Sequence, residues 1–259
     1  MILLHTLGSL DLTGPDGQSL DAILAQPKRT LLLAYLATAT PRGFHRRDVL
    51  IALFWPELDA ERARGALRKA LHFLRATLGD AVLTRGDEVA LDTSALDSDV
   101  AMLERAIAEG RLTDAMTLYR GEFLRGVFAK DAPDVERWVQ SERARLGALA
   151  TRTAWTLAEA AVLTDPDTAT RWSLAALALT PGDEAALRRS MALLARSGAR
   201  AVALRAYDDF AEALATDYPG AEPSDITRDL RNQLRDGKES PVQLEAARDD
   251  AFVGNQSSP

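Results

Sequence analysis

A row of basic side chains within residues 59–79 is the clearest sign of a binding surface in the sequence. Arg64, Arg68, His72 and Arg75 are spaced i, i+4, i+8 and i+11, so a helix places them along one face. The two acids of this segment both lie in its first turn, where they complement the helix dipole. Solvated helices usually interleave both signs of charge, whereas this face is cationic throughout. Such a helix suits the DNA major groove, where arginine reaches phosphates and guanine edges.

Four further bases are candidate DNA contacts. Lys69 lies on the same segment, Arg46 and Arg47 open the preceding predicted helix, and Arg85 lies at the tip of a predicted hairpin. Bases at such positions can reach phosphates next to the groove. A single exposed arginine is more often solvated surface than a contact, so the prediction depends on the row of bases as a set.

The residue types of the chain do not favour a catalytic site, a metal site or a cofactor site. The chain has no cysteine, which removes disulfides, Cys-ligated zinc, iron–sulfur clusters and thiol catalysis. Its three histidines, His5, His45 and His72, are far apart and lack metal-ligand spacing. The sequence contains neither a Gly-rich phosphate loop nor a Gly-x-Ser-x-Gly motif. We therefore predict no catalytic residue, no metal site and no cofactor, and expect the protein not to be an enzyme.

The strands and helices expected around these bases follow the order of a winged helix. Short strands are expected in residues 1–25, around the turn signal Gly14-Pro15-Asp16-Gly17. The apolar period then becomes helical. Three predicted helices and a hairpin follow, at residues 28–39, 46–54, 59–79 and 81–91.

An apolar stripe on the third predicted helix explains how its bases would be held outward. Leu67, Leu71, Leu74 and Leu78 are spaced i, i+4, i+7 and i+11, about 100° around the helix from the basic row. One side of this helix is therefore expected in the core and an adjoining side in solvent.

The second half of the chain reads as helical hairpins from Asp97 to about residue 236. The pattern Gly110-x4-Ala115-x3-Tyr119 returns at Gly198-x4-Ala203-x3-Tyr207. Ala169 and Ala176 lie 34 residues, the tetratricopeptide period, before Ala203 and Phe210. Ser173 stands where this repeat usually has an aromatic residue. We predict a mainly α protein with a winged-helix DNA-binding domain, a tetratricopeptide-like helical domain and a disordered tail, at residues 1–95, 96–237 and 238–259.

The net charge of −7 argues against DNA binding until it is divided between the two predicted domains. Residues 1–95 hold 11 bases and 11 acids and are neutral, whereas residues 96–259 hold 20 bases and 27 acids. The acidity therefore belongs to the helical part. The longest apolar stretch, at about residues 30–39, is too short to span a bilayer, and a signal peptide is not evident, so we expect a cytoplasmic protein without a membrane partner.

Several segments resemble bacterial transcriptional activators of the Streptomyces antibiotic regulatory protein type, which join an OmpR-like winged helix to a bacterial transcriptional activator domain. In the first half, the similar segments are Pro27-Lys28-Arg29-Thr30-Leu31-Leu32-Leu33-Ala34-Tyr35-Leu36, Arg47-Asp48-Val49-Leu50-Ile51-Ala52-Leu53-Phe54-Trp55-Pro56 and residues 63–80. In the second half they are residues 138–146, 203–214 and 222–224. Departures are Arg46 in place of a serine helix cap and Gly65 in place of an asparagine.

The resemblance implies a sequence-specific transcriptional regulator, an activator by type, that reads double-stranded DNA with residues 59–78 in the major groove. It further implies that the helical domain mediates homodimerisation or contact with RNA polymerase. The alternative is a tetratricopeptide-like interaction scaffold whose winged helix no longer binds DNA. The basic row is the feature that separates the two interpretations.

Overall fold

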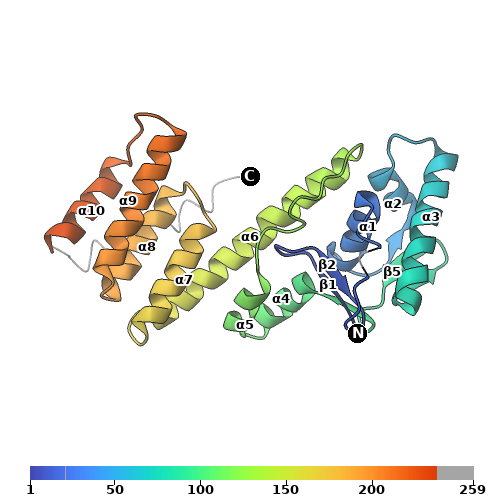
Figure 1. Cartoon of the computed structure of the whole chain (residues 1–259), viewed down its shortest axis with the longest axis horizontal. Helices are drawn as coiled ribbons and strands as arrows, with labels where there is room; N and C mark the ends of the chain where they lie inside the picture. The colour runs from blue at the N-terminus through green and yellow to red at the C-terminus, as the bar shows by residue number, and fades with distance from the viewer. Residues whose placement is uncertain (21, 238–259) are drawn as a thin grey trace. The chain divides into compact units, whose positions relative to one another are not determined.

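The computed structural model describes residues 1–20 and 22–237, and Figure 1 labels its elements. Contacts between residues divide the chain into two compact units, Met1–Gly147 and Ala148–Pro259. The division falls within the 29-residue helix α6 (Pro133–Ala161). The tail predicted at residues 238–259 lies outside the described residues.

The first unit contains the three predicted helices. They are α1 (Pro27–Thr38), α2 (Arg47–Phe54) and α3 (Ala60–Leu78). Pro27 begins α1 at the position where its missing N–H costs nothing. The consecutive leucines 31–33 are all fully buried, so α1 is the central helix of this core.

A three-stranded antiparallel sheet completes the winged helix. Its strand order is β3 (His45–Arg46), β5 (Glu88–Leu91) and β4 (Val82–Arg85). The 3₁₀ turn Gly79–Ala81 leads from α3 into β4, and Arg85 pairs with Glu88 across the hairpin. The predicted hairpin is thereby confirmed, and β3 joins it from the start of α2.

A second sheet links the N-terminus to the residues that follow the winged helix. Its strands are β2 (Asp11–Thr13), β1 (Ile2–His5) and β6 (Leu96–Ser98), with β1 and β6 parallel. Short strands in residues 1–25 were expected, but the parallel pairing of β1 with β6 was not. Residues 96–147, assigned from sequence to the helical domain, lie in the first compact unit, while the domain limits near residues 95 and 237 stay predictions.

A buried carboxylate holds β1 against the helix that follows β6, α4 (Asp99–Ala108). The Asp99 carboxylate accepts hydrogen bonds from the backbone N–H groups of Thr6 and Leu7, each at 2.7 Å, and from the Thr6 hydroxyl at 2.9 Å. Burial raises the pKa of Asp99 above its ordinary value. The hydrogen bonds compensate the carboxylate for the water that it loses.

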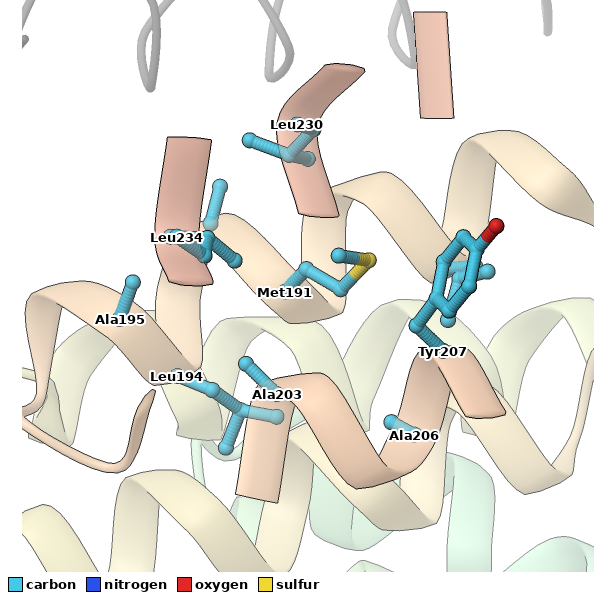
Figure 2. Close-up of a cluster of buried hydrophobic side chains, with 10 residues drawn as sticks. Met191, Leu194, Ala195, Ala203, Ala206, Tyr207, Leu230 and Leu234 are labelled. Carbon is cyan, nitrogen blue, oxygen red and sulfur yellow. The ribbon is translucent and has the colours of Figure 1, made fainter. Parts of the chain in front are cut away.

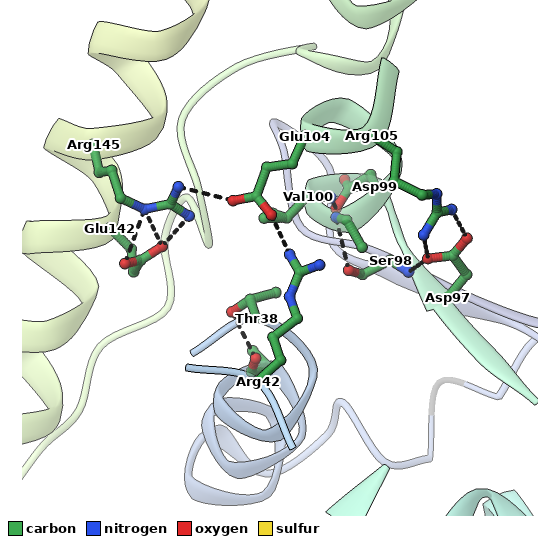
Figure 3. Close-up of polar contacts among 12 residues, drawn as sticks. Thr38, Arg42, Asp97, Ser98, Asp99, Val100, Glu104, Arg105, Glu142 and Arg145 are labelled. Atoms are coloured by element: carbon green, nitrogen blue, oxygen red, sulfur yellow. Dashed lines mark hydrogen bonds and ion pairs between the residues drawn. The ribbon is translucent and has the colours of Figure 1, made fainter. Parts of the chain in front are cut away.

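A charged network connects the first unit's later helices to the winged helix (Figure 3). Glu104 of α4 binds Arg42, which follows α1, and its other oxygen lies 2.8 Å from Arg145 of α6. Arg145 also lies 2.7 Å from Glu142, and Arg105 pairs with Asp97 of β6. An aromatic contact adds to this network, because the ring centroids of Tyr35 on α1 and Trp138 on α6 lie 5.0 Å apart. The winged helix and α4–α6 therefore share one packed core.

The second unit is helical throughout its described part. After the second half of α6 come α7 (Pro166–Ala178), α8 (Glu184–Arg196), α9 (Arg200–Asp217) and α10 (Asp225–Asp236). Figure 2 shows the cluster that α8, α9 and α10 bury together. Its members are Leu187, Met191, Ala192, Leu194, Ala195, Ala203, Ala206, Tyr207, Leu230 and Leu234.

The two matching sequence patterns form similar helical hairpins. Gly110 and Gly198 both have left-handed backbones, with φ of 74° and 81°, at turns between consecutive helices. Ala115 and Ala203 are both fully buried, which allows the paired helices to approach closely. The hairpins differ afterwards: Tyr207 lies inside α9, whereas Tyr119 ends the short helix α5 (Leu112–Leu118). Residues 119–132 form no helix, so the break expected at residues 126–133 begins seven residues earlier.

The overall fold class is mainly α with a small N-terminal sheet region, as predicted. In the part of the chain that the structure describes, we find no helix with the length and hydropathy that crossing a bilayer requires.

The burial of His45 predicts that the winged helix is less stable in acid. Burial lowers the pKa of His45 below 6.5. The centroids of the His45 and Tyr35 rings lie 5.1 Å apart. The buried Nε2 of His45 has no hydrogen-bond partner within the described residues. The unfolded chain therefore binds this proton more tightly than the folded chain, and stability falls as the pH drops below about 6.5. In His45→Phe the ring contact remains and the orphaned nitrogen is removed.

We expect His45→Phe to unfold at an equal or higher temperature than the wild type at pH 8. The difference between the two should grow at pH 5.5, as measured by thermal unfolding followed by circular dichroism. A constant difference between the two pH values would contradict the assignment of acid sensitivity to His45.

A buried hydroxyl pair replaces the aromatic residue expected at Ser173. The hydroxyls of Ser173 on α7 and Ser190 on α8 lie 2.9 Å apart, and both residues are fully buried. Ser173→Ala leaves the Ser190 hydroxyl without this partner, which costs about 1–3 kcal/mol. Ser173→Ala/Ser190→Ala removes both polar groups and should recover most of that loss. Urea unfolding of the wild type, both single variants and the double variant measures this coupling, and additive losses would refute it.

Candidate nucleic-acid interface

Burial of one face sets the orientation of α3. The Asp59 carboxylate accepts a hydrogen bond from the Arg62 N–H at 2.9 Å and so caps the helix start. Leu67, Leu71 and Leu74 are each at most 1% exposed. Replacing such a buried leucine by alanine typically costs 2–5 kcal/mol, so the helix has little freedom to rotate about its axis.

The neighbouring face of α3 carries the predicted basic row. Arg64, Arg68 and His72 are exposed, and within residues 1–20 and 22–237 they form neither an ion pair nor a side-chain hydrogen bond. Arg75, the fourth member, is half-buried and donates a hydrogen bond to the Thr84 hydroxyl of β4. Three of the four predicted residues therefore present unpaired polar groups to solvent, and the fourth connects α3 to the wing.

The predicted bases outside α3 are already paired with acids. Arg85 lies 2.8 Å from Glu88 and stacks on the Phe44 ring, 4.1 Å from its centroid. Arg46 pairs with Asp48 at 2.5 Å, and the Arg47 Nε lies 3.7 Å from Asp87. These pairs are exposed and individually weak, but they reduce the net positive charge around the wing. Two of these ion pairs could have been predicted from the sequence, because Glu88 follows Arg85 by three residues and Asp48 follows Arg46 by two.

Lys69 lies apart from the basic row. On a helix its side chain starts about 100° beyond that of Arg68. It lines a cavity together with Phe73 of α3 and residues of α1. The structure therefore brings Arg64, Arg68, His72 and Arg75 together on one face and places Lys69 on another.

The arrangement offers charge and hydrogen-bond donors rather than catalytic chemistry. Guanidinium groups present several N–H donors in a fixed plane, a geometry that matches phosphate oxygens and the guanine edge. Among the described residues, we find no group of three His, Asp or Glu side chains placed to hold a metal ion.

Comparison with known proteins gives a family match and a likeness to solved structures. The family model described as "Bacterial transcriptional activator domain" matches residues 91–235. Among solved structures, the chain is similar to Mycobacterium tuberculosis EmbR in complex with a low-affinity phosphopeptide. That likeness has a TM-score of 0.60 at 21% identity and covers 97% of this chain and 69% of the other, so it supports the fold. A search of curated proteins returned no match.

Proposed function

The chain belongs to the bacterial transcriptional activator domain family, and we propose that it regulates transcription by binding specific double-stranded DNA through α3. The observation that carries this proposal is that Arg64, Arg68 and His72, beside the buried leucines, have no side-chain partner among the described residues. A helix held in this way can insert its cationic face into the major groove without disturbing the core.

We assign the bases of the interface different roles. Arg64 and Arg68 carry full charge in solvent and would contact phosphates or guanine edges. Arg75, held by Thr84, would position the wing relative to α3. Arg46, Arg47 and Arg85 must exchange an acid partner for a phosphate, so we expect each to contribute less than Arg68. Lys69, which faces a different side, is expected to contribute least.

The helical part is proposed to contact partners, as homodimer surface or as the surface that meets RNA polymerase. The support for this is the family match, which covers residues 91–235. We also propose that the protein acts without catalysis and without a cofactor. A scaffold without DNA binding remains the second candidate, and the DNA-binding experiment below separates it from the first.

Arg68→Ala should weaken DNA binding and reduce its salt dependence. Genomic fragments recovered with the full chain supply a specific duplex, and a scrambled duplex supplies the non-specific reference. By fluorescence anisotropy, loss of one phosphate contact should reduce the slope of log K against log salt by about one unit on both duplexes. Loss of a guanine contact should instead weaken the specific duplex by about 1–3 kcal/mol.

The matched control is Arg62→Ala on the same helix. Arg62 is exposed, pairs with Asp59 at 3.3 Å and starts about 120° around the helix from Arg68. Its removal should leave the affinity close to that of the wild type. Equal losses in both variants would refute the interface, and recovery of no genomic fragment would favour the scaffold.

Replacing Gly65 by alanine should change the stability of the protein and its affinity for DNA in opposite directions. Gly65 lies inside α3 next to the basic row, and a Cβ built at Gly65 would have no atom within 4 Å apart from its chain neighbours and the adjacent backbone of α3. Alanine should therefore stabilise the helix by up to about 1 kcal/mol. The same methyl group would stand where the helix backbone approaches the duplex.

We expect Gly65→Ala to unfold at a higher temperature while binding the specific duplex more weakly. Thermal unfolding and anisotropy on the same sample measure both effects. Ala76→Gly, an exposed change at the opposite end of the helix, should reverse the first effect and spare the second. Higher stability with unchanged affinity in Gly65→Ala would mean that the duplex does not approach this residue.

A further inference from the structure

A cavity in the first unit lies beside α3 on the face that carries Lys69. Its volume is about 990 Å³, within the range of small-molecule sites in proteins. The N-terminal part of α1, the middle of α3 and the loop that precedes α6 form its walls. Trp55, Phe73, Val127 and Phe128 supply much of its apolar lining, and Phe128 is 61% exposed. An exposed aromatic ring at the edge of an apolar hollow is typical of a surface that a ligand covers.

Cations surround this apolar lining. Lys28, Arg29, Lys69 and Lys130 line the cavity, against one acid, Asp131. The chain has 27 arginines and four lysines, and three of those lysines line this one cavity. A lysine stem can lie along an apolar surface while its ammonium group acts as a single mobile charge. The cavity therefore combines apolar walls with positive charge at its edges.

Two of the four cations are free to bind an anion. Lys28 lies 2.7 Å from Glu57, and Arg29 bonds to Gln26 and stacks on Phe73 at 3.8 Å from the ring centroid. Lys69 and Lys130 are exposed and form no ion pair within the described residues. They come from different walls, α3 and the loop, so an anion between them would bridge the two.

The loop wall is held in place by α6. The Glu136 carboxylate accepts a hydrogen bond from the Ala129 N–H at 3.1 Å, which lowers the pKa of Glu136. Arg143 donates to the carbonyl oxygens of Phe123 and Leu124 at 2.9 and 2.8 Å. Asp131 has a left-handed backbone with φ of 62°, a strained conformation for a residue with a side chain. A wall fixed in this way lowers the entropic cost of binding.

We propose that this cavity binds a small amphipathic anion, a molecule with an apolar body and one carboxylate. The apolar body would cover Phe73, Val127 and Phe128, and the carboxylate would lie between Lys69 and Lys130. Nucleic acid fits the cavity less well, because its backbone presents a charge at every nucleotide and the walls here are apolar. The assignment rests on the cavity itself and does not depend on the proposed DNA binding.

The test compares two probes of equal apolar length on the full chain. The neutral dye N-phenyl-1-naphthylamine reports occupancy by its fluorescence, and decanoate or decanol displaces it. Two solvated ion pairs should make decanoate displace the dye at about tenfold lower concentration than decanol. In Lys69→Gln/Lys130→Gln this preference should fall to about twofold or less, while the dye still binds.

Two control variants locate the site. Arg137→Gln/Arg152→Gln also removes two positive charges, from exposed positions on α6 that do not line the cavity, and should keep the tenfold preference. Ala66→Phe places a ring in the cavity from a half-buried position on α3 and should abolish dye binding, with folding checked by circular dichroism. Equal displacement by decanoate and decanol in the wild type would overturn the proposal. So would equal losses in the two charge variants, or dye binding that survives in folded Ala66→Phe.

Discussion

Burial of the leucine face of α3 is the constraint on which the rest of the candidate interface depends. Because Leu67, Leu71 and Leu74 are almost wholly inaccessible, the rotation of the helix about its axis is set by the core. The residues one step around the helix must then face solvent, and these are arginines and a histidine. Turning that face inward would bury charged groups in an apolar core without partners, which costs several kcal/mol of folding free energy for each group.

The remaining side of the same helix has a different character. Ala66, Lys69, Ala70 and Phe73 face a cavity that α1 and the loop before α6 complete. The helix α3 therefore has three different faces. One packs in the core, one presents charged side chains to solvent, and one lines an apolar cavity. The wing contributes differently, because its Arg85 is paired with Glu88, and Arg75 of α3 donates a hydrogen bond to Thr84 of β4.

The winged helix does not end where its own elements end. The parallel pairing of β1 with β6, the Asp99 carboxylate and the ring contact of Tyr35 with Trp138 attach α4–α6 to it. Glu104 holds arginines from two other segments at once. In the second unit, leucines, Met191 and Tyr207 pack with alanines of α8 and α9, and a buried pair of serine hydroxyls joins α7 to α8. The packed core of the first unit therefore extends from the leucine face of α3 to the first half of α6.

Local pattern determined a large part of this protein from sequence alone: the three helices, the hairpin, the leucine stripe and the basic row all follow from spacing within about 20 residues. The absence of cysteine and the division of charge also needed no structure. Tertiary structure decided which bases are unpaired, that Lys69 faces a cavity, that β6 pairs with β1, and that the first unit extends to Gly147. These features join residues far apart in the chain, and periodicity along one segment carries no information about which distant segment will cover it.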